Sequence, residues 1–167
     1  SLATDTLSLP EYKTLISGRK VYGGGGIRPD FYVESDTTEI SDYAVQIISQ
    51  GVYSDFVMAY LDANREKLKS QYPTFAAFNE QFRLSDVDME ALVATATAKG
   101  VEYNAEGYTL SKEYLRDQLT SIIAQRLYSV SDGYQWLNPR RNLYYKRAIS
   151  ILENWREEVE PLLNQNK

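Results

Sequence analysis

The sequence of 167 residues contains neither cysteine nor histidine. Without cysteine there are no disulfides, thiolate nucleophiles or thiolate zinc sites, although such a chain folds in either redox environment. Without histidine a Ser-His-Asp triad is excluded, and a catalytic zinc site loses its usual imidazole ligands. Carboxylates, lysines, tyrosines and hydroxyls remain as catalytic groups, and no cofactor or metal is indicated.

Long apolar runs and an excess of positive charge are also missing. No run approaches the roughly 20 residues of a membrane-spanning helix, and the first residues, Ser1 to Asp5, do not begin a signal peptide. The chain has 18 Lys and Arg against 23 Asp and Glu, a net charge of −5. Nucleic acids and anionic lipids attract basic surfaces. We therefore expect no nucleic-acid partner and no membrane span.

The first 36 residues differ in pattern from the rest. Short β-leaning segments occur at Tyr12–Ile16, Lys20–Tyr22 and Phe31–Val33, with Ser17-Gly18 as a turn between the first two. Strands this short do not form a stable sheet alone. We expect them to belong to a larger sheet whose other strands lie upstream.

From residue 37 onward the apolar spacing is helical, with 43% hydrophobic and 25% charged residues in the whole chain. The pattern predicts a mainly α fold, a bundle of about six helices in 37–167 preceded by a few short β-strands in 1–36. Residues Val101 to Leu110 fit either a small hairpin or a loop. The expected N-caps are Ser41, Ser54, Thr74, Ser85, Ser111 and Asn138, and the expected stops are Gly51, Pro73, Gly100 and the segment Ser131-Asp132-Gly133.

The last predicted helix begins at Asn138-Pro139 and carries a long apolar stripe. A narrow stripe of this length usually packs along another helix. We therefore expect a buried face. Its members are Tyr144, Ala148, Ile151, Trp155, Val159 and Leu162.

Four consecutive glycines, Gly23 to Gly26, precede Ile27-Arg28-Pro29. A phosphate-binding loop requires a lysine and a hydroxyl residue after its glycines, where a helix opens. Here Pro29 biases Arg28 toward an extended conformation, so neither that loop nor a dinucleotide fingerprint is present. On physical grounds the run is a turn between strands.

The segment from Gly18 to Asp30 reads Gly-Arg, apolar residues, a glycine run and Ile-Arg-Pro-Asp. It resembles the segment that ends the catalytic domain of carboxyl-terminal processing (tail-specific) serine peptidases. The helical stretch through Pro73 resembles the tail of the Bacteroidetes-type members. The matching positions, which we interpret as structural, are Gly18, Arg19, Gly25, Gly26, Ile27, Pro29 and Asp30.

The resemblance implies a C-terminal fragment of such a peptidase, with residues 1–36 ending the catalytic domain and 37–167 forming a helical domain. These endopeptidases of the bacterial cell envelope or periplasm cleave proteins near their C-terminal ends with a serine nucleophile and a lysine base. Those motifs and the PDZ module lie upstream, and neither Lys13 nor Lys20 matches the context of the base. The fragment alone would be inactive. Its implied partners are protein or peptide substrates, the missing catalytic and PDZ domains, and a second copy in a homo-oligomer.

Three other groups have two interpretations each. Arg28 and Asp30 could line a site or pair at a strand edge. Acidic residues near 86–90 could bind a cation, but helix starts attract acids, and the spacing of a calcium loop is absent. Five aromatic residues could form a peptide groove or pack in the helical core. The two larger groups are Asp86, Asp88 and Glu90, and Tyr128, Tyr134, Trp136, Tyr144 and Tyr145.

Two functions follow from these patterns. The first is the C-terminal region of a processing serine endopeptidase, serving in docking, substrate engagement or assembly. The second is a helical protein-binding or assembly domain without enzymatic activity, which the helical tail and the long apolar stripe indicate. A carboxylate-based enzyme is disfavoured, because no pair of acids stands out.

Overall fold

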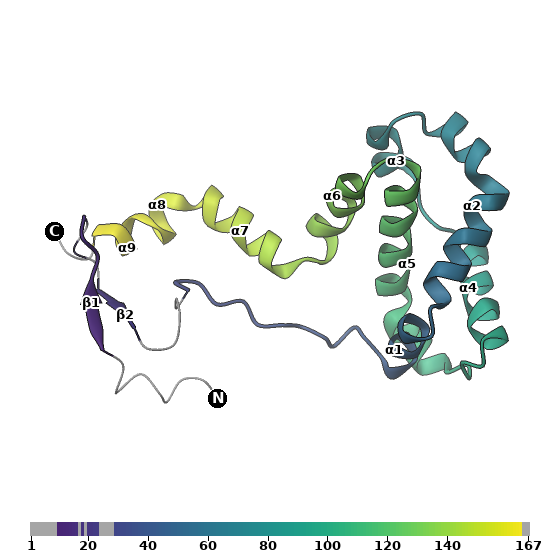
Figure 1. Cartoon of the computed structure of the whole chain (residues 1–167), viewed down its shortest axis with the longest axis horizontal. Coiled ribbons are helices and arrows are strands. Elements are labelled where there is room, and N and C mark those ends of the chain that lie inside the picture. The colour runs from purple at the N-terminus through teal and green to yellow at the C-terminus, as the bar shows by residue number, and fades with distance from the viewer. Residues whose placement is uncertain (1–9, 17, 19, 24–28, 165–167) are drawn as a thin grey trace. The chain divides into compact units, whose positions relative to one another are not determined.

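The computed structural model describes residues 10–16, 18, 20–23 and 29–164. It is mainly helical, which confirms the predicted fold class (Figure 1). Contacts group the chain into two units: Ser35–Leu143 forms one, and Ser1–Glu34 with Tyr144–Lys167 forms the other. No helix in the described part is long and apolar enough to cross a membrane.

The strands β1 (Glu11–Lys13) and β2 (Lys20–Tyr22) pair antiparallel, with Glu11 opposite Tyr22. Gly18 has a φ of 65° in the connecting turn, and its N–H donates to the Thr14 carbonyl. Such a φ favours glycine. The first two strand predictions are therefore confirmed in position, although β1 ends before the exposed Leu15 and Ile16.

The predicted strand at Phe31–Val33 is wrong. Residues 31–33 have no strand partner in the described part of the chain. The Phe31 ring instead lies 5.3 Å from the guanidinium carbon of Arg147. The aromatic ring of Phe31 therefore contacts a helix residue, and the segment does not pair in a sheet.

Six helices build Ser35–Leu143, and three short helices follow in the C-terminal segment. The long α5 packs against α1, α2 and α6, and α2 also packs against α4. The hydrophobic core that these helices enclose includes Phe78, Leu115, Leu119 and Trp136. The helices are α1 (Asp42–Ser49), α2 (Val52–Gln71), α3 (Phe75–Gln81), α4 (Asp86–Ala98), α5 (Ala105–Leu127), α6 (Val130–Arg141), α7 (Leu143–Glu153), α8 (Trp155–Glu158) and α9 (Glu160–Asn164).

Several predicted helix ends are confirmed. The side chains of Ser41, Thr74 and Ser85 each accept a hydrogen bond from a first-turn N–H, and Ser85 forms a capping box with Asp88. These bonds satisfy donors that a helix start leaves open. Gly51 and Gly100, with φ values of 69° and 83°, follow α1 and α4 as predicted stops.

Other predicted ends are wrong because tertiary contacts extend the helices. Helix α2 begins at Val52, so Ser54 is no cap. The segment Val101–Leu110, for which a hairpin or a loop was expected, is helical from Ala105 onward, because Asn104 caps α5. Ser111 is therefore no cap and is buried inside α5. Helix α6 runs through both Gly133 and Pro139.

The prediction of a single long C-terminal helix is also wrong, because this segment forms three helices, α7, α8 and α9. Asn154 has non-helical dihedral angles, and its side-chain amide donates to the Ser150 carbonyl. Pro161 lacks an N–H and its ring disfavours a continuous helix in the preceding turn. These two residues explain the interruptions at Asn154 and Val159.

Candidate protein-binding surface

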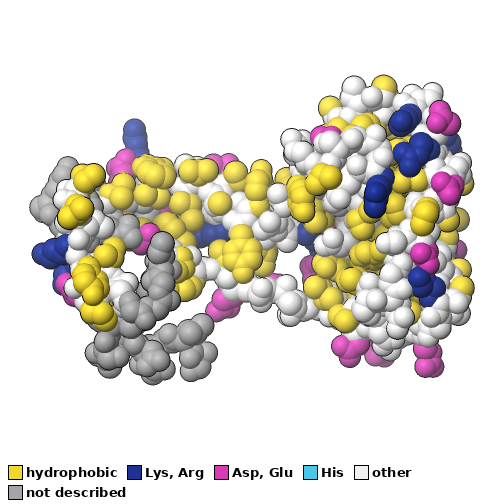
Figure 2. Space-filling view, viewed as in Figure 1, with side chains coloured by type: hydrophobic (Ala, Val, Ile, Leu, Met, Phe, Trp, Pro, Cys, Tyr) yellow, Lys and Arg dark blue, Asp and Glu magenta, His cyan; other side chains and the backbone are white. Residues whose placement is uncertain are grey.

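Helix α7 has a strongly apolar side but no buried residue. Leu152 is 61% exposed and Trp155, the first residue of α8, is 45% exposed. Ile151 and Val159 are only half-buried, so the prediction that the Ile151-Trp155-Val159 face is buried is wrong. Figure 2 shows hydrophobic side chains at the surface of this segment. We define the C-terminal apolar face as Tyr144, Ala148, Ile149, Ile151 and Leu152, which recur at helical spacing on α7, together with Trp155 at the start of α8.

The polar side of α7 is engaged within the chain. The Arg147 guanidinium pairs with the Glu158 carboxylate, with one N–O distance of 2.8 Å. The same guanidinium lies over the Phe31 ring. These contacts fix one side of α7 against its own unit and leave the apolar side exposed.

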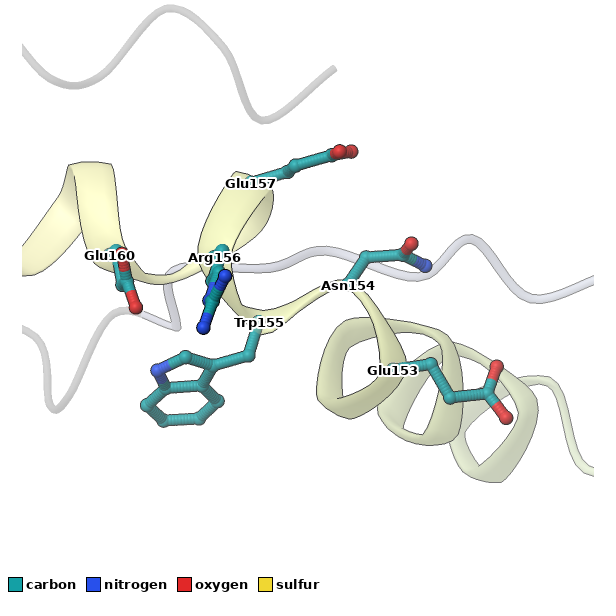
Figure 3. A pocket seen from close by; sticks show the side chains of 6 residues that line it. All are labelled: Glu153, Asn154, Trp155, Arg156, Glu157 and Glu160. Carbon is teal, nitrogen blue, oxygen red and sulfur yellow. The ribbon is translucent and has the colours of Figure 1, made fainter.

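A hollow of about 400 Å³ surrounds Trp155. In Figure 3 the indole projects away from the ribbon, while Glu157 points in the opposite direction. Tryptophan and arginine are frequent anchors of protein interfaces. Trp155 and Arg156 are residues of this kind, although three of the six lining residues are glutamates. The lining residues are Glu153, Asn154, Trp155, Arg156, Glu157 and Glu160.

A smaller hollow of about 220 Å³ lies between α4 and α5. Its carboxylate Asp86 already pairs with Arg116 at 2.7 Å and Lys112 at 2.9 Å. Hydrogen bonds from these two cations hold the pKa of Asp86 below its usual value. Asp88 caps α4, so helix capping and ion pairing account for these two acids. Among the described residues, no cluster of three or more Asp or Glu side chains is arranged to hold a metal ion.

The five aromatic residues considered for a peptide groove divide between core and surface. Trp136 is fully buried, and the Arg140 guanidinium carbon lies 3.7 Å from its ring centroid. Tyr128 is half-buried and donates a hydrogen bond of 2.6 Å to the Tyr72 carbonyl. Tyr134, Tyr144 and Tyr145 are exposed. The core interpretation therefore holds for the first two residues only.

The motif between residues 18 and 30 is described in part. Gly18 lies in the β1–β2 turn, and Pro29 and Asp30 are exposed. The remaining candidates lie outside the described residues, as does Arg28. These candidates are Arg19, Gly25, Gly26 and Ile27.

Ile149 and Leu152 were missed as surface residues by the sequence analysis. Both belong to the apolar side of α7 and widen the narrow stripe that the sequence showed. The sequence signal was the amphipathic spacing itself. Whether such a side is exposed depends on whether another element covers it, which the spacing does not report.

A mainly helical domain with an exposed apolar face is the class that the fold and surface define. The chain belongs to DUF8443, a family of unknown function, whose model matches residues 43–129. The match runs from α1 to the end of α5, and α6 to α9 lie beyond it.

The chain is similar to the protein named "Protein J1 homolog" of Fowlpox virus (strain NVSL). The two are 26% identical over 106 residues, which cover 60% of this chain and 72% of the viral protein. No solved structure matches the chain.

These findings overturn the resemblance to carboxyl-terminal processing peptidases. The family is one of unknown function and the relative is a viral J1 homologue, so assignment as a bacterial serine endopeptidase fragment is wrong. The 13-residue segment that suggested it, Gly18 to Asp30, lies outside the family match. Its glycine-rich order was too short a pattern to identify a family. The envelope or periplasm location and the protease partners depended on that assignment and lose their support with it.

Proposed function

We propose that the protein is a non-enzymatic helical domain that binds another protein through its C-terminal apolar face. The observation that carries this proposal is the exposure of Leu152 and Trp155 on a segment with no buried residue. Contiguous exposed apolar patches commonly mark interaction sites. The α1–α6 unit would then serve as the stable scaffold that presents the face.

The charge of the segment favours a protein over a membrane surface. Residues 143–164 contain three basic side chains and four acidic ones. Amphipathic helices that lie on anionic membranes carry a polar face rich in Lys and Arg. The mixed charge around Trp155 instead resembles the polar rim of a protein interface.

Photocrosslinking tests the proposal directly. A benzophenone amino acid at position 152 is expected to form a protein adduct of defined mass in an extract of the source cells, and Ile149→Asp is expected to abolish the adduct. The matched control places the same group at position 87, since Val87 is also exposed but lies on α4. The absence of any protein adduct at position 152, or equal adducts at both positions, would contradict the proposal.

A further inference from the structure

We infer that Arg83 and Arg140 form a binding site for a phosphate monoester group on the α1–α6 unit. Both guanidinium groups lie over the ring of the buried Trp136, with their carbons 5.0 Å and 3.7 Å from its centroid. Arg83 follows α3, whereas Trp136 and Arg140 belong to α6. All three residues lie within Ser35–Leu143, and none belongs to the C-terminal apolar face.

Hydrogen-bond donors exceed acceptors in this cluster. The Arg140 guanidinium donates to the Trp136 carbonyl at 2.8 Å and to the Asn79 side-chain oxygen at 3.3 Å, and both bonds use Nη1. Its other N–H groups have no acceptor among the described residues, and neither has the exposed guanidinium of Arg83. The buried indole N–H of Trp136 also has no acceptor there, which is rare for a buried N–H. The chemistry that the cluster lacks is an acceptor-rich group.

The two positive charges also lack a counter-ion. Neither Arg83 nor Arg140 forms an ion pair with a carboxylate in the described part of the chain. The Asp117 carboxylate acts on Arg140 from a distance, but it is bound to Arg141 at 2.6 Å. Burial lowers the pKa of Arg140, and the charge of Arg83 lowers it further. Charges that leave water are usually paired, so the site favours an anion supplied from outside.

The number of charges selects the class of anion. Guanidinium groups bind both carboxylates and phosphates through paired N–H···O bonds. One carboxylate neutralises only one of the two arginines. A phosphate monoester carries about −1.5 to −2 charges at pH 7 and three acceptor oxygens, so one group can neutralise both arginines. A nucleic acid carries a single charge on each phosphate, and the net charge of −5 repels such a polyanion.

Proton–nitrogen correlation spectra of the ¹⁵N-labelled full chain test the inference. The probe is phosphoserine with both ends blocked, so that its only charge is on the phosphate. The chain has two tryptophans, and the Trp155→Phe spectrum assigns their indole signals. The Trp136 indole signal is expected to shift with a dissociation constant on the order of 1 mM, while the Trp155 signal stays in place. A Trp136 signal that does not move at tens of mM probe would overturn the inference.

Substitution of the exposed arginine separates a built site from general attraction of anions. Arg83→Gln is expected to weaken binding about tenfold, because it removes charge-assisted hydrogen bonds. Arg83→Lys keeps the charge but loses the planar fork, and an intermediate loss of about threefold is expected. Arg126→Gln removes another exposed arginine, on α5, and is the matched control with unchanged affinity. Equal losses in Arg83→Gln and Arg126→Gln would overturn the site.

Two further ligands test the class of anion and its source. Blocked glutamate, which carries one negative charge, is expected to bind about tenfold more weakly than blocked phosphoserine, and equal binding would overturn the phosphate assignment. Inorganic phosphate that binds as tightly as blocked phosphoserine supports a free phosphate ligand, whereas weaker binding supports a phosphorylated side chain. The site shares no residue with the C-terminal apolar face, so the failure of either proposal leaves the other standing.

Discussion

Ser111 connects two helices that lie far apart in the sequence. Its hydroxyl oxygen accepts the Ser41 N–H at 2.8 Å, and its O–H donates to the Ser41 oxygen at 2.9 Å. The Ser41 hydroxyl in turn donates to the Gly107 carbonyl at 2.8 Å. The N-cap of α1 is thereby joined to α5 through a hydroxyl pair in which Ser111 is buried and Ser41 is half-buried.

Replacing Ser111 by Ala is expected to destabilise the fold by about 1–3 kcal/mol. The half-buried Ser41 N–H would lose its acceptor, the hydroxyl of a Ser111 side chain that is 0% exposed. Urea unfolding measures the change. Ser49→Ala, which removes an exposed hydroxyl from α1, is the control and should shift stability by less than about 0.5 kcal/mol. Similar losses in both variants would refute the role of the buried network.

Gly133 allows α6 to approach α5 closely. A Cβ at this position would lie 2.8 Å from the Ser121 carbonyl oxygen and 2.1 Å from Gln125 Cγ. The Ser121 hydroxyl also donates to the Gly133 carbonyl at 2.9 Å. Glycine is therefore required here by contact, although its φ is not in the left-handed region.

Gly133→Ala is expected to lower stability by about 1–3 kcal/mol through overpacking. An exposed helical glycine would respond in the opposite direction, because alanine favours helix by about 1 kcal/mol. Thermal unfolding followed by circular dichroism distinguishes the two signs. The exposed neighbour Ser131, changed to Ala, provides the control on the same helix. A stabilised Gly133→Ala protein would show that α5 and α6 do not approach this closely.

At the scale of elements, helix α2 carries two tyrosines in apolar surroundings, Tyr53 and Tyr60. Burial raises the pKa of Tyr60 to about 12, and the nearby Asp88 adds to the shift. Burial also raises the pKa of Tyr53. Both hydroxyls therefore remain neutral in the folded protein at a pH that ionises tyrosine in an unfolded chain.

This difference predicts the alkaline limit of stability. The folded pKa of Tyr60 lies above the unfolded value of about 10, so its contribution is complete below pH 10 and is lost between about pH 10 and 12. Tyr60→Phe should move the alkaline unfolding midpoint upward and gain on the order of 1–2 kcal/mol near pH 12. The midpoint is measured by circular dichroism across the pH range. Tyr144→Phe, at an exposed hydroxyl, should leave the midpoint in place; an equal shift would contradict the assignment to α2.

At the scale of the whole molecule, buried apolar side chains concentrate in one unit. The core residues run from Tyr43 to Trp136, all within Ser35–Leu143. Helices α7 and α8 contribute no buried residue. The stability of the fold therefore resides in α1–α6, while the C-terminal segment supplies the exposed face.

Limited proteolysis should reveal this division. Trypsin is expected to cut first near Lys146 and Arg147 and to leave a resistant fragment that ends close to residues 35 and 143, because backbone without a buried core opens at low free-energy cost. Mass spectrometry of the fragments gives the boundaries. Early cleavage at Lys67 or Arg116 inside α2 or α5, at the same rate, would contradict a single stable core.

The sequence by itself determined the helical class, the strand positions near residues 12 and 21, and the caps at Ser41, Thr74 and Ser85. These features depend on contacts within a few residues, which the local order of side chains dictates. The same local signals misplaced Ser111, Gly133 and Pro139, because long-range packing of α5 and α6 overrode them.

The tertiary structure alone decided which apolar stripes are covered. The stripe of Leu115, Leu119 and Ile123 is buried, whereas the equally regular C-terminal stripe with Leu152 and Trp155 is exposed. Periodicity reports that a helix has an apolar side, but burial requires a second surface placed by the rest of the chain. The candidate binding surface could be foreseen as a pattern of residues and not as a surface, since its exposure is a property of the folded neighbours.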